Sequence, residues 1–420
     1  MAYRVAAIDV HKMVLIVAVA TAGDEVPDVA GEALEFECRR FGAMAEERQH
    51  LIAWLAQRGV REVVMESTAQ YWKPVWLDLE PHFAKLHLAQ AQSNRAPKGR
   101  KDDYRDAKRL ARRLLAGELM LSFIPGPEQR TWRELARAKD QYVRERVRVR
   151  NRIESHLEEM RIKLSGVISD LLGVSGRRIL TALAQGETDP VQLSELGDDR
   201  LQCDRETLID ALRGSPTPIQ LQILKLHLKM LGEIDAIIAS LDQLLAEDLK
   251  KHEQAVIRLA EAPGFGVDSA QRMIAEIGVD AEAFPSADEF ASWFGGCPGS
   301  DISAEQNHNT SSPKGNRYVR KLLTQAAQAA VKKKGCFYQS LFRRFLPRLT
   351  YPGAIWAVAH RLGRLVWKIL HQQVRYVEQG EETNPRARKR RTQKLTQALR
   401  KLGYAVTLTP LTPNTHAGQG

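Results

Sequence analysis

Cysteine is scarce in this chain: its 420 residues include only four, and no two of them form a Cys-x-x-Cys pair. This excludes a zinc ribbon and a thioredoxin-like redox site, and it is typical of proteins from a reducing compartment. Aromatic residues make up only 6%, which argues against an aromatic-rich β-sandwich or a carbohydrate-binding surface.

Long apolar runs are also missing. The longest, Met13 to Ala22, is far shorter than the roughly 18 residues that a membrane helix needs. Asp9 interrupts the first apolar stretch, and an acid there is wrong for a signal peptide. We therefore expect a cytoplasmic protein with no membrane partner.

Positive charge is in excess, because 62 Lys and Arg stand against 51 Asp and Glu, for a net charge of +11. Such a surplus favours a polyanionic partner, most plausibly nucleic acid, although many basic proteins bind none. The 44% hydrophobic and 27% charged content is that of a folded globular protein. The length suits two or three domains.

The first 90 residues alternate between strand and helix signals. Val5–Val10 and Met13–Ala20 are apolar, β-branched runs separated by two residues, which predicts a hairpin of two buried strands. The patterns that follow are a helix, a strand ending on Glu66, a helix and a strand, over Met44–Arg58, Glu62–Met65, Tyr71–Leu79 and Lys85–Leu88. This order indicates a mixed α/β sheet.

Two long helical patterns dominate the middle of the chain, Gln129–Leu164 and Pro218–Leu249. Their apolar steps of three and four residues predict a packed seam, either an antiparallel coiled-coil pair or a dimer arm. Further helices are expected at Asp103–Leu115, Arg317–Val331 and Ile355–Leu370. We expect four regions with bounds 1–125, 126–250, 251–375 and 376–420. The last is a flexible tail in which Arg386–Lys401 holds eight basic residues and no acid.

Four acids stand where they could bind a metal. Asp9 lies inside the first strand, Glu66 ends another, and Asp103 and Asp106 are three residues apart at the start of a helix. Carboxylates that converge at one end of a sheet bind Mg²⁺, and paired ions support phosphoryl transfer. Nine Lys and Arg lie between residues 95 and 113, as a phosphodiester substrate requires. Each acid also has an ordinary explanation, as a solvent-facing strand residue or a helix N-terminal charge, and Asp102 competes with Asp103.

Segments in both halves of the chain resemble one family. AIDVHK, VVMESTAQYW, GRKDDYRDAKRLARRL and SFIPGPEQRTWREL resemble the N-terminal half of the DEDD insertion-sequence transposases, the group associated with bridge RNA. APGFGVDSAQRMIAEIG, FASWFGGCPGSDISAE and SPKGNRYVRKLLTQAA resemble its C-terminal transposase half. The similarities occur in order and span roughly residues 3 to 370, so the tail lies outside them.

The resemblance implies a RuvC-like, RNase H-type fold for region 1–125, with two Mg²⁺ ions held by Asp9, Glu66, Asp103 and Asp106. The family's motif reads Lys-Thr-Asp-x-x-Asp-Ala, and here Asp102 replaces the threonine. The spacing to Ala107 assigns the ligand to Asp103 and leaves Asp102 beside the site.

For region 251–375 the resemblance implies a nucleophilic serine between a Gly-x-x-Pro-Gly segment and a Lys-Gly-Asn turn, which is Ser303. Nearby alternatives are Ser300, Ser311 and Ser312, and His308 is a weak candidate for a general base. A serine hydroxyl needs a base or a metal to activate it, and a phosphoserine link to DNA would conserve the energy of the phosphodiester.

Several basic or glycine-rich segments are candidates for nucleic-acid contact. Gly264 and Gly266, ahead of the helix Ser269–Ile277, resemble a helix-hairpin-helix, in which backbone N–H groups approach a phosphate; the alternative is an ordinary helix–helix turn. We expect further phosphate contacts, against the alternative of a solvated surface, from Asn94, Arg95, Lys98, Arg100, Lys101, Lys314, Asn316, Arg317, Arg320 and Lys321.

The resemblance thus implies a fold that combines a RuvC-like mixed α/β sheet, long coiled-coil helices and a mostly helical C-terminal transposase domain. It implies a Mg²⁺-dependent transposase or site-specific recombinase that acts on donor and target DNA through phosphoserine, guided by a bridge RNA. We expect assembly into homodimers or homotetramers, associated with the bacterial nucleoid. The alternatives are a RuvC-like endonuclease whose nucleophile is water, and a non-catalytic scaffold that binds nucleic acid.

Overall fold

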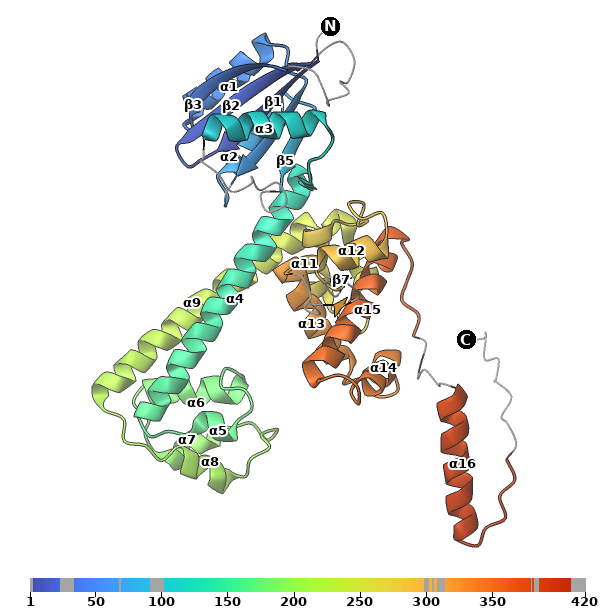
Figure 1. Ribbon diagram of the computed structural model, residues 1–420. Coiled ribbons are helices and arrows are strands. Elements are labelled where there is room, and N and C mark those ends of the chain that lie inside the picture. The colour runs from blue at the N-terminus through green and yellow to red at the C-terminus, as the bar shows by residue number, and fades with distance from the viewer. Residues whose placement is uncertain are drawn as a thin grey trace. The chain divides into compact units, whose positions relative to one another are not determined.

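The computed structural model describes residues 3–22, 34–67, 69–90, 102–297, 302–303, 306–307, 314–378, 380 and 385–408 (Figure 1). The chain divides into two compact units, Met1–Gly126 and Pro127–Gly420. Each unit has its own hydrophobic core, and each is described by itself below.

The N-terminal unit is built on a six-stranded mixed sheet with the order β3-β2-β1-β4-β5-β6. The strands are β1 Tyr3–Val10, β2 Val14–Ala22, β3 Glu35–Gly42, β4 Glu62–Ser67, β5 Lys85–Ala89 and β6 Leu121–Ser122. β1 and β2 form the antiparallel hairpin that the sequence predicts, and β1 pairs in parallel with β4. The predicted mixed α/β, RuvC-like sheet is therefore confirmed, with β3 and β6 as strands that the sequence analysis missed.

Helices cover both faces of this sheet. α1 (Ala45–Gln57) and α2 (Trp72–Leu79) pack on the face that carries Ile8 of β1. α3 (Asp103–Leu115) packs on the other face, against Val5, Ala7 and Val64. Successive strand side chains point to opposite faces. Asp9 therefore shares the α3 face with Ala7, and Glu66 shares it with Val64.

The C-terminal unit contains a long arm made of α4 (Pro127–Glu159) and α9 (Pro218–Asp248), which lie side by side in Figure 1. Contacts between Arg146 and Asp235 (3.0 Å) and between His156 and Gln220 (2.9 Å) show that the two helices are antiparallel. The predicted coiled-coil pair is confirmed. α4 ends five residues before the predicted end, because Arg161 adopts a positive φ of 65°.

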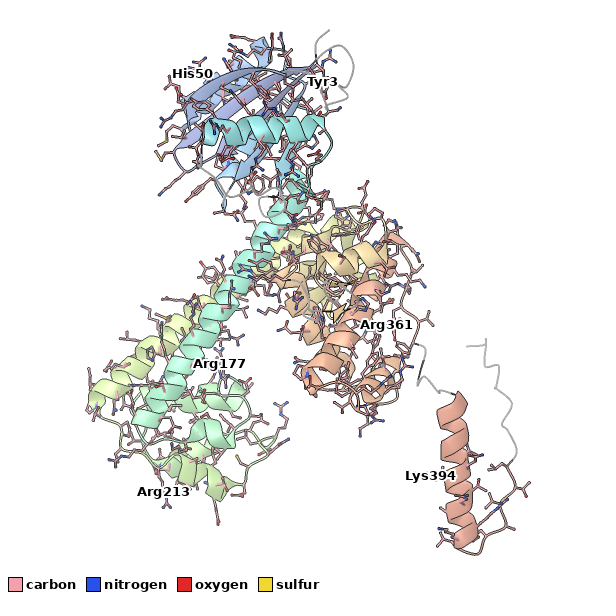
Figure 2. The ribbon with its side chains drawn as sticks, viewed as in Figure 1. Tyr3, His50, Arg177, Arg213, Arg361 and Lys394 are labelled. Carbon is pink, nitrogen blue, oxygen red and sulfur yellow. The ribbon has the colours of Figure 1, made fainter. Side chains whose placement is uncertain are left out.

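Four short helices that the sequence analysis did not separate from the arm lie between its two helices in the chain. They are α5 (Leu164–Val167), α6 (Val174–Ala184), α7 (Pro190–Glu195) and α8 (Arg205–Ala211). Their apolar residues share one core with the end of α4 and the start of α9. Arg177 of α6 also donates to Asp235 of α9 at 2.5 Å, which bonds this small bundle to the arm (Figure 2).

The rest of the unit is a helical core around α15 (Tyr351–His371), whose Val358, Leu362 and Val366 are fully buried. The elements around it are a 3₁₀ turn at Lys250–His252, α10 (Glu253–Ala260), α11 (Val267–Ile277), α12 (Ala287–Trp293), α13 (Arg317–Ala330) and α14 (Phe337–Phe345). A two-stranded hairpin, β7 (Ile302–Ser303) with β8 (Gln306–Asn307), lies between α12 and α13 in the chain. The predicted, mostly helical C-terminal region is confirmed.

The tail holds one more helix, α16 (Pro385–Lys401), where we expected flexible chain. Residues 386–401 contain neither proline nor glycine, and Pro385 stands at a position that proline favours, the first turn of a helix. Among the described residues, no helix combines the length and the apolar content needed to cross a membrane.

Candidate functional site

The central sheet brings two of the predicted acids together. In the parallel pairing of β1 with β4, Asp9 is directly opposite Glu66, and both side chains point to the α3 face of the sheet. The Asp9 side chain is 19% exposed, so this carboxylate reaches solvent at the end of the strand. Two carboxylates this close repel each other unless a cation lies between them.

The start of α3 separates the roles of two neighbouring aspartates. Asp102 is the N-cap, and its Oδ1 accepts a hydrogen bond from the backbone N–H of Tyr104 at 3.1 Å. Asp103 lies in the first turn, and its Oδ1 is 3.8 Å from Nε2 of His11. The side chain of Asp102 is thus engaged in capping α3, whereas the side chain of Asp103 faces the end of β1.

His11 lies between the acids of the strand and the helix. Its Nε2 is 3.2 Å from Oδ2 of Asp9, and Asp9, His11 and Asp103 each offer one ligand atom within 4.8 Å of the others. That nitrogen is buried and makes no hydrogen bond to any residue that the structure describes. A buried imidazole nitrogen without a hydrogen bond, next to two carboxylates, provides ligand atoms that fit a divalent cation.

Glu66 and Asp106 complete the group of acids. Burial raises the pKa of Glu66, and the charges of Asp9 and Asp106 raise it further, while Arg109 and Arg113 oppose the shift. Asp106 is one turn along α3 from Asp103 and lies 3.8 Å from Arg109. Glu66 and Asp106 therefore lie near Asp9 at the same end of the sheet, whereas the ligand atoms within 4.8 Å of one another are those of Asp9, His11 and Asp103.

His11 is not among the four metal ligands expected from the sequence. The signal that could have found it is alternation, because His11 is two residues after Asp9 and therefore points to the same face. The turn between β1 and β2 holds it there, since its N–H donates to the carbonyl of Val14 at 2.9 Å.

An open cleft of about 1030 Å³ reaches this group of acids. His11 and Asp103 line it, together with three cationic side chains, Lys12, Arg40 and Arg105. Carboxylates for a metal and cations for a phosphate on one wall suit a phosphodiester substrate. Four other predicted contacts, Arg95, Lys98, Arg100 and Lys101, lie outside the described residues, as does Asn94.

Ser303 belongs to the C-terminal unit, whereas the four acids belong to the N-terminal unit. Its backbone forms part of β7 and pairs with Gln306. The alternatives Ser300, Ser311 and Ser312 and the candidate base His308 lie outside the described residues.

The residues just before and just after the segment that carries Ser303 pack against each other. Gly315 has a φ of +50°, and a Cβ built on it would be 2.3 Å from the backbone of Phe294. Arg320 adds a hydrogen bond at this contact, because its Nη1 donates to the carbonyl of Gly295 at 2.8 Å. The glycine of the Lys-Gly-Asn turn is thus required by close packing of two backbones.

Asn316, after this glycine, joins α13 to a buried acid. Its side-chain oxygen accepts from the N–H groups of Tyr318 (2.9 Å) and Val319 (3.1 Å), and its Nδ2 donates to Oε2 of Glu276 at 3.0 Å. Glu276 is 1% exposed, and Arg137 of α4 donates to both of its carboxylate oxygens at 2.8 Å. A buried carboxylate needs such partners.

The predicted phosphate contacts near this turn differ in what their side chains do. Lys321 bonds the buried Asp140 at 2.6 Å, and the guanidinium of Arg320 stacks over Trp356 at 4.2 Å. Asn316 is bonded as described, so these three have structural partners. Arg317 lies over the ring of Tyr318, and Lys314 is exposed. Contact of these residues with nucleic acid stays a prediction.

The glycines of the turn between α10 and α11 also have structural roles. Gly264 has a φ of +82°, and a Cβ there would be 2.0 Å from the carbonyl oxygen of Ala326 in α13. Gly266 is the N-cap of α11, and its N–H donates to Oγ of Ser269 at 2.8 Å. The alternative that the sequence analysis kept open, a helix–helix turn, explains both glycines.

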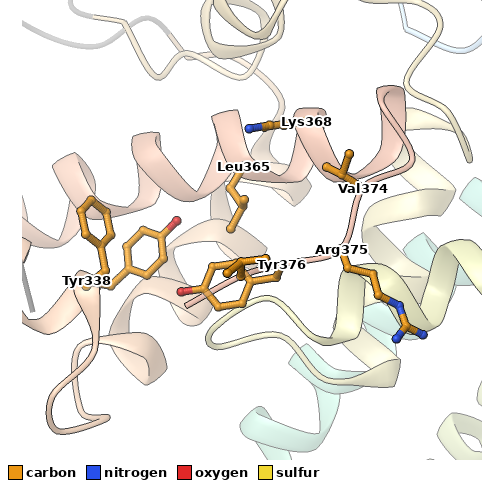
Figure 3. A pocket seen from close by; sticks show the side chains of 8 residues that line it. Tyr338, Leu365, Lys368, Val374, Arg375 and Tyr376 are labelled. Carbon is orange, nitrogen blue, oxygen red and sulfur yellow. The ribbon is translucent and has the colours of Figure 1, made fainter. Parts of the chain in front are cut away.

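A second cavity, of about 210 Å³, lies in the C-terminal unit between α14, α15 and the segment that follows (Figure 3). Tyr338, Leu365 and Tyr376 line it, and the hydroxyl of Tyr376 donates to Glu378 at 2.9 Å. Burial raises the pKa of both tyrosines. The cavity is smaller than ligand sites usually are, and no residue singled out from the sequence lines it.

Comparison with known families matches two regions of the chain. A family model for IS110-type DEDD transposases matches residues 6–162. A second model, for transposases of the IS116/IS110/IS902 family, matches residues 257–340. No curated protein matches the chain. The first region contains all four predicted metal-binding acids, and the second contains Ser303 and the turn that follows it. The chain therefore belongs to the IS110 type of DEDD transposases, DNA-processing enzymes that act by phosphoryl transfer.

Proposed function

We propose that this transposase cleaves and exchanges DNA strands with a Mg²⁺ site held by Asp9, Glu66, Asp103 and Asp106 and with Ser303 as the nucleophile. The observation that carries the proposal is the cluster of Asp9, His11 and Asp103, with Glu66 and Asp106 nearby at the same end of the sheet, beside a cleft with a cationic wall. Two Mg²⁺ ions there would activate the attacking oxygen and stabilise the leaving one.

The protein's own residues would carry the remaining work. The Ser303 hydroxyl gives up its proton and its oxygen bonds to phosphorus, while the bond from phosphorus to one deoxyribose oxygen breaks and that oxygen is protonated. The reverse step, with a hydroxyl from another strand, rejoins the DNA without ATP. Lys12, Arg40 and Arg105 lie where they would neutralise the phosphates of a bound strand.

The partners follow from the family. We infer that the enzyme acts on a donor and a target DNA and that a bridge RNA selects both by base pairing, so that sequence choice lies outside the protein. We also infer homodimers or homotetramers, because exchange involves four cut strands, and a place in the bacterial cytoplasm at the nucleoid. Sequencing RNA that copurifies with the protein tests the guide, since the RNA should match DNA that flanks the gene.

One observation favours a second candidate, a RuvC-like endonuclease that uses water. The acids, His11 and the cleft all belong to the N-terminal unit, so a metal site there needs no residue of the other unit.

A suicide DNA substrate separates the two candidates. The wild-type enzyme with Mg²⁺ should form a protein–DNA adduct that is absent from Ser303→Ala, while the matched variants Ser300→Ala and Ser311→Ala still form it. Cleavage by Ser303→Ala without any adduct would instead establish water as the nucleophile. Full activity of Asp9→Asn and Glu66→Gln would refute both candidates.

A further inference from the structure

The helix α16 (Pro385–Lys401) carries most of the excess positive charge of the chain. Residues 386–401 contain eight Lys and Arg and no acid. Without these eight, 54 Lys and Arg stand against 51 Asp and Glu, so the net charge falls from +11 to +3. Both regions that match the transposase families, 6–162 and 257–340, lie elsewhere in the chain. The charge that favours a polyanionic partner is therefore concentrated in one helix that the family similarity does not cover.

The basic residues of α16 have no acid beside them in the helix. Five of the six residues 386–391 are basic, and Lys394, Arg400 and Lys401 follow. Residues three or four apart are neighbours on a helix, and like charges there destabilise it. With 17 residues, α16 is close to the length below which isolated helices are marginal in water. A polyanion aligned with the helix would remove this repulsion.

The apolar residues of α16 are too few and too localised for a helix that lies on a membrane. Leu395, Leu399 and Leu402 are 43–73% exposed and stand together at its C-terminal end. Residues 385–394 contain no large apolar side chain, whereas a membrane-surface helix has an apolar face along its length. Five of the eight basic residues are arginines, whose guanidinium groups pair with phosphates through two hydrogen bonds. This composition favours the phosphate backbone of a nucleic acid.

The length of α16 also suits a duplex. At 1.5 Å per residue its 17 residues extend about 25 Å. A DNA duplex carries one negative charge per about 1.7 Å, and therefore about 15 phosphates over that distance. Every basic residue of the helix can thus find a phosphate within one turn or two of a duplex.

Three hydrogen bonds anchor the chain just before α16. Oε1 of Glu378 accepts from the N–H groups of Phe337 and Gly380, each at 3.0 Å, and Oε2 accepts from the hydroxyl of Tyr376 at 2.9 Å. Phe337 starts α14 of the helical core. Five residue steps from Gly380 to Pro385 span at most about 18 Å. A nucleic acid bound to α16 is therefore held near the helical core.

We propose that α16 is a second nucleic-acid-binding site, at which its Lys and Arg residues bind the phosphate backbone of a duplex without reading its sequence. The site goes beyond the proposed function, because binding there needs neither the metal site nor Ser303. Duplex DNA and duplex RNA offer the same phosphate chemistry, and the experiment distinguishes them.

The first test is duplex binding by the full-length protein, measured by fluorescence anisotropy with EDTA in place of Mg²⁺. The probes are a DNA and an RNA duplex of equal length, about 30 base pairs, with unrelated sequences. A chain that ends at residue 380 keeps the anchor at Glu378 and should bind at least about tenfold more weakly in about 100 mM salt. On DNA, its plot of log affinity against log salt should be less steep by at least about 2.7, the contribution of three phosphate contacts.

Each outcome of this test has one meaning. A loss on DNA alone assigns α16 to the donor or target duplex, a loss on RNA alone assigns it to the guide, and a loss on both assigns it to either backbone; all three support the proposal. Unchanged affinity and salt dependence on both probes overturn it, and so does a wild type that binds neither probe.

Matched substitutions separate the helix from the net charge of the chain. Arg390→Gln with Arg391→Gln in α16 should weaken binding at least about threefold. The control, Arg205→Gln with Arg213→Gln, removes the same charge from two exposed arginines of the small bundle and should leave binding within about 1.5-fold. Equal losses in the two double variants would show that only the net charge matters and would overturn the proposal.

A last pair of measurements tests the leucines. Leu395→Gln with Leu399→Gln keeps every charge of α16 and should leave the affinity for both duplexes within about twofold. A loss as large as that of the shortened chain would make the apolar residues the contact surface and overturn the proposal. The same holds if the wild type binds vesicles of phosphatidylserine and phosphatidylcholine through α16 more tightly than it binds either duplex.

Discussion

Asp102 and Asp103 are neighbours with the same side chain, but the structure gives them different surroundings. Asp102 caps α3, and asparagine caps a helix as well as aspartate does. Asp103 faces His11 and Asp9, where the proposed metal site would use its charged carboxylate. The replacement of threonine by Asp102 that the sequence analysis noted therefore exchanges one cap for another.

We predict that Asp102→Asn leaves Mg²⁺-dependent DNA cleavage nearly unchanged and that Asp103→Asn lowers it by at least roughly 100-fold. Thermal unfolding of both variants should stay close to wild type, so that a loss of activity reflects the site. Equal losses in the two variants would show that Asp102 also holds the metal.

His227 gives the arm a dependence on pH. Burial lowers its pKa, and His156 and Arg152 on α4 lower it further; the two histidine rings are 5.9 Å apart. His227 is therefore harder to protonate in the folded arm than in the unfolded chain, where a histidine has a pKa of about 6.5. This contribution to stability is present above that pH and is lost as the pH falls.

We expect the thermal midpoint of the wild type to fall between pH about 7.5 and about 5.5, and His227→Gln to reduce that fall. Replacing His50, which is exposed, in the same way is the control. An identical fall in His227→Gln and wild type would assign the effect to other groups.

At the scale of elements, the turn before α13 is the most constrained segment. Gly315→Ala places a Cβ against the backbone of Phe294 and forces alanine to a positive φ, which should cost at least about 2 kcal/mol of unfolding free energy. Gly166→Ala is the comparison, because that glycine has open space and no positive φ, and it should be neutral or stabilising. Urea unfolding of both variants measures the difference.

Asn316→Asp should be far more harmful than such a change normally is at a helix start. Aspartate keeps the cap but removes the donor to Glu276 and sets a second carboxylate beside it, at about 2–4 kcal/mol. The reverse exchange at the exposed cap of α8, Asp204→Asn, should change the free energy of unfolding by less than about 0.5 kcal/mol. Similar effects at the two caps would remove the role assigned to Glu276.

The elements found from the sequence are those with a strong apolar period. Pro218 and Thr217 mark the start of α9, and its period continues to Asp248, as predicted. β3 was missed because half of its side chains are charged and exposed, as in an edge strand. The small bundle was missed because its helices are short and their apolar residues are buried only against each other and the arm.

Across the whole molecule, the acids were predictable from local pattern, because alternation in β1 and β4 and the three-residue step in α3 set their directions. His11 follows the same alternation, because it is two residues after Asp9, but it lies in the turn after the strand and was not among the expected ligands. No local pattern specifies Glu276, because its role depends on Arg137, which is 139 positions away in the sequence and reaches it only in the folded chain. Ser303 rests on family resemblance, since a serine in a polar loop carries no signal of its own.

The N-terminal unit has its own core and all four acids, so we predict that residues 1–126 fold alone and bind Mg²⁺. Added Mg²⁺ should raise the thermal midpoint of this fragment, because a ligand stabilises the state that binds it. The same fragment with Asp9→Asn should show a smaller rise. No rise in either fragment would mean that the metal site needs more of the chain.

The bidentate grip of Arg137 on Glu276 has a mechanical consequence. Arg137 belongs to α4, which runs the length of the arm, and Glu276 in turn holds the residue that starts α13. Turning α4 about its axis by one residue moves a side chain by about 100°, which would pull Arg137 off the carboxylate. Rotation of α4 about its axis is therefore opposed by the Arg137–Glu276 contact. Because Glu276 also bonds Asn316, this resistance acts at the start of α13, directly after the segment that carries Ser303.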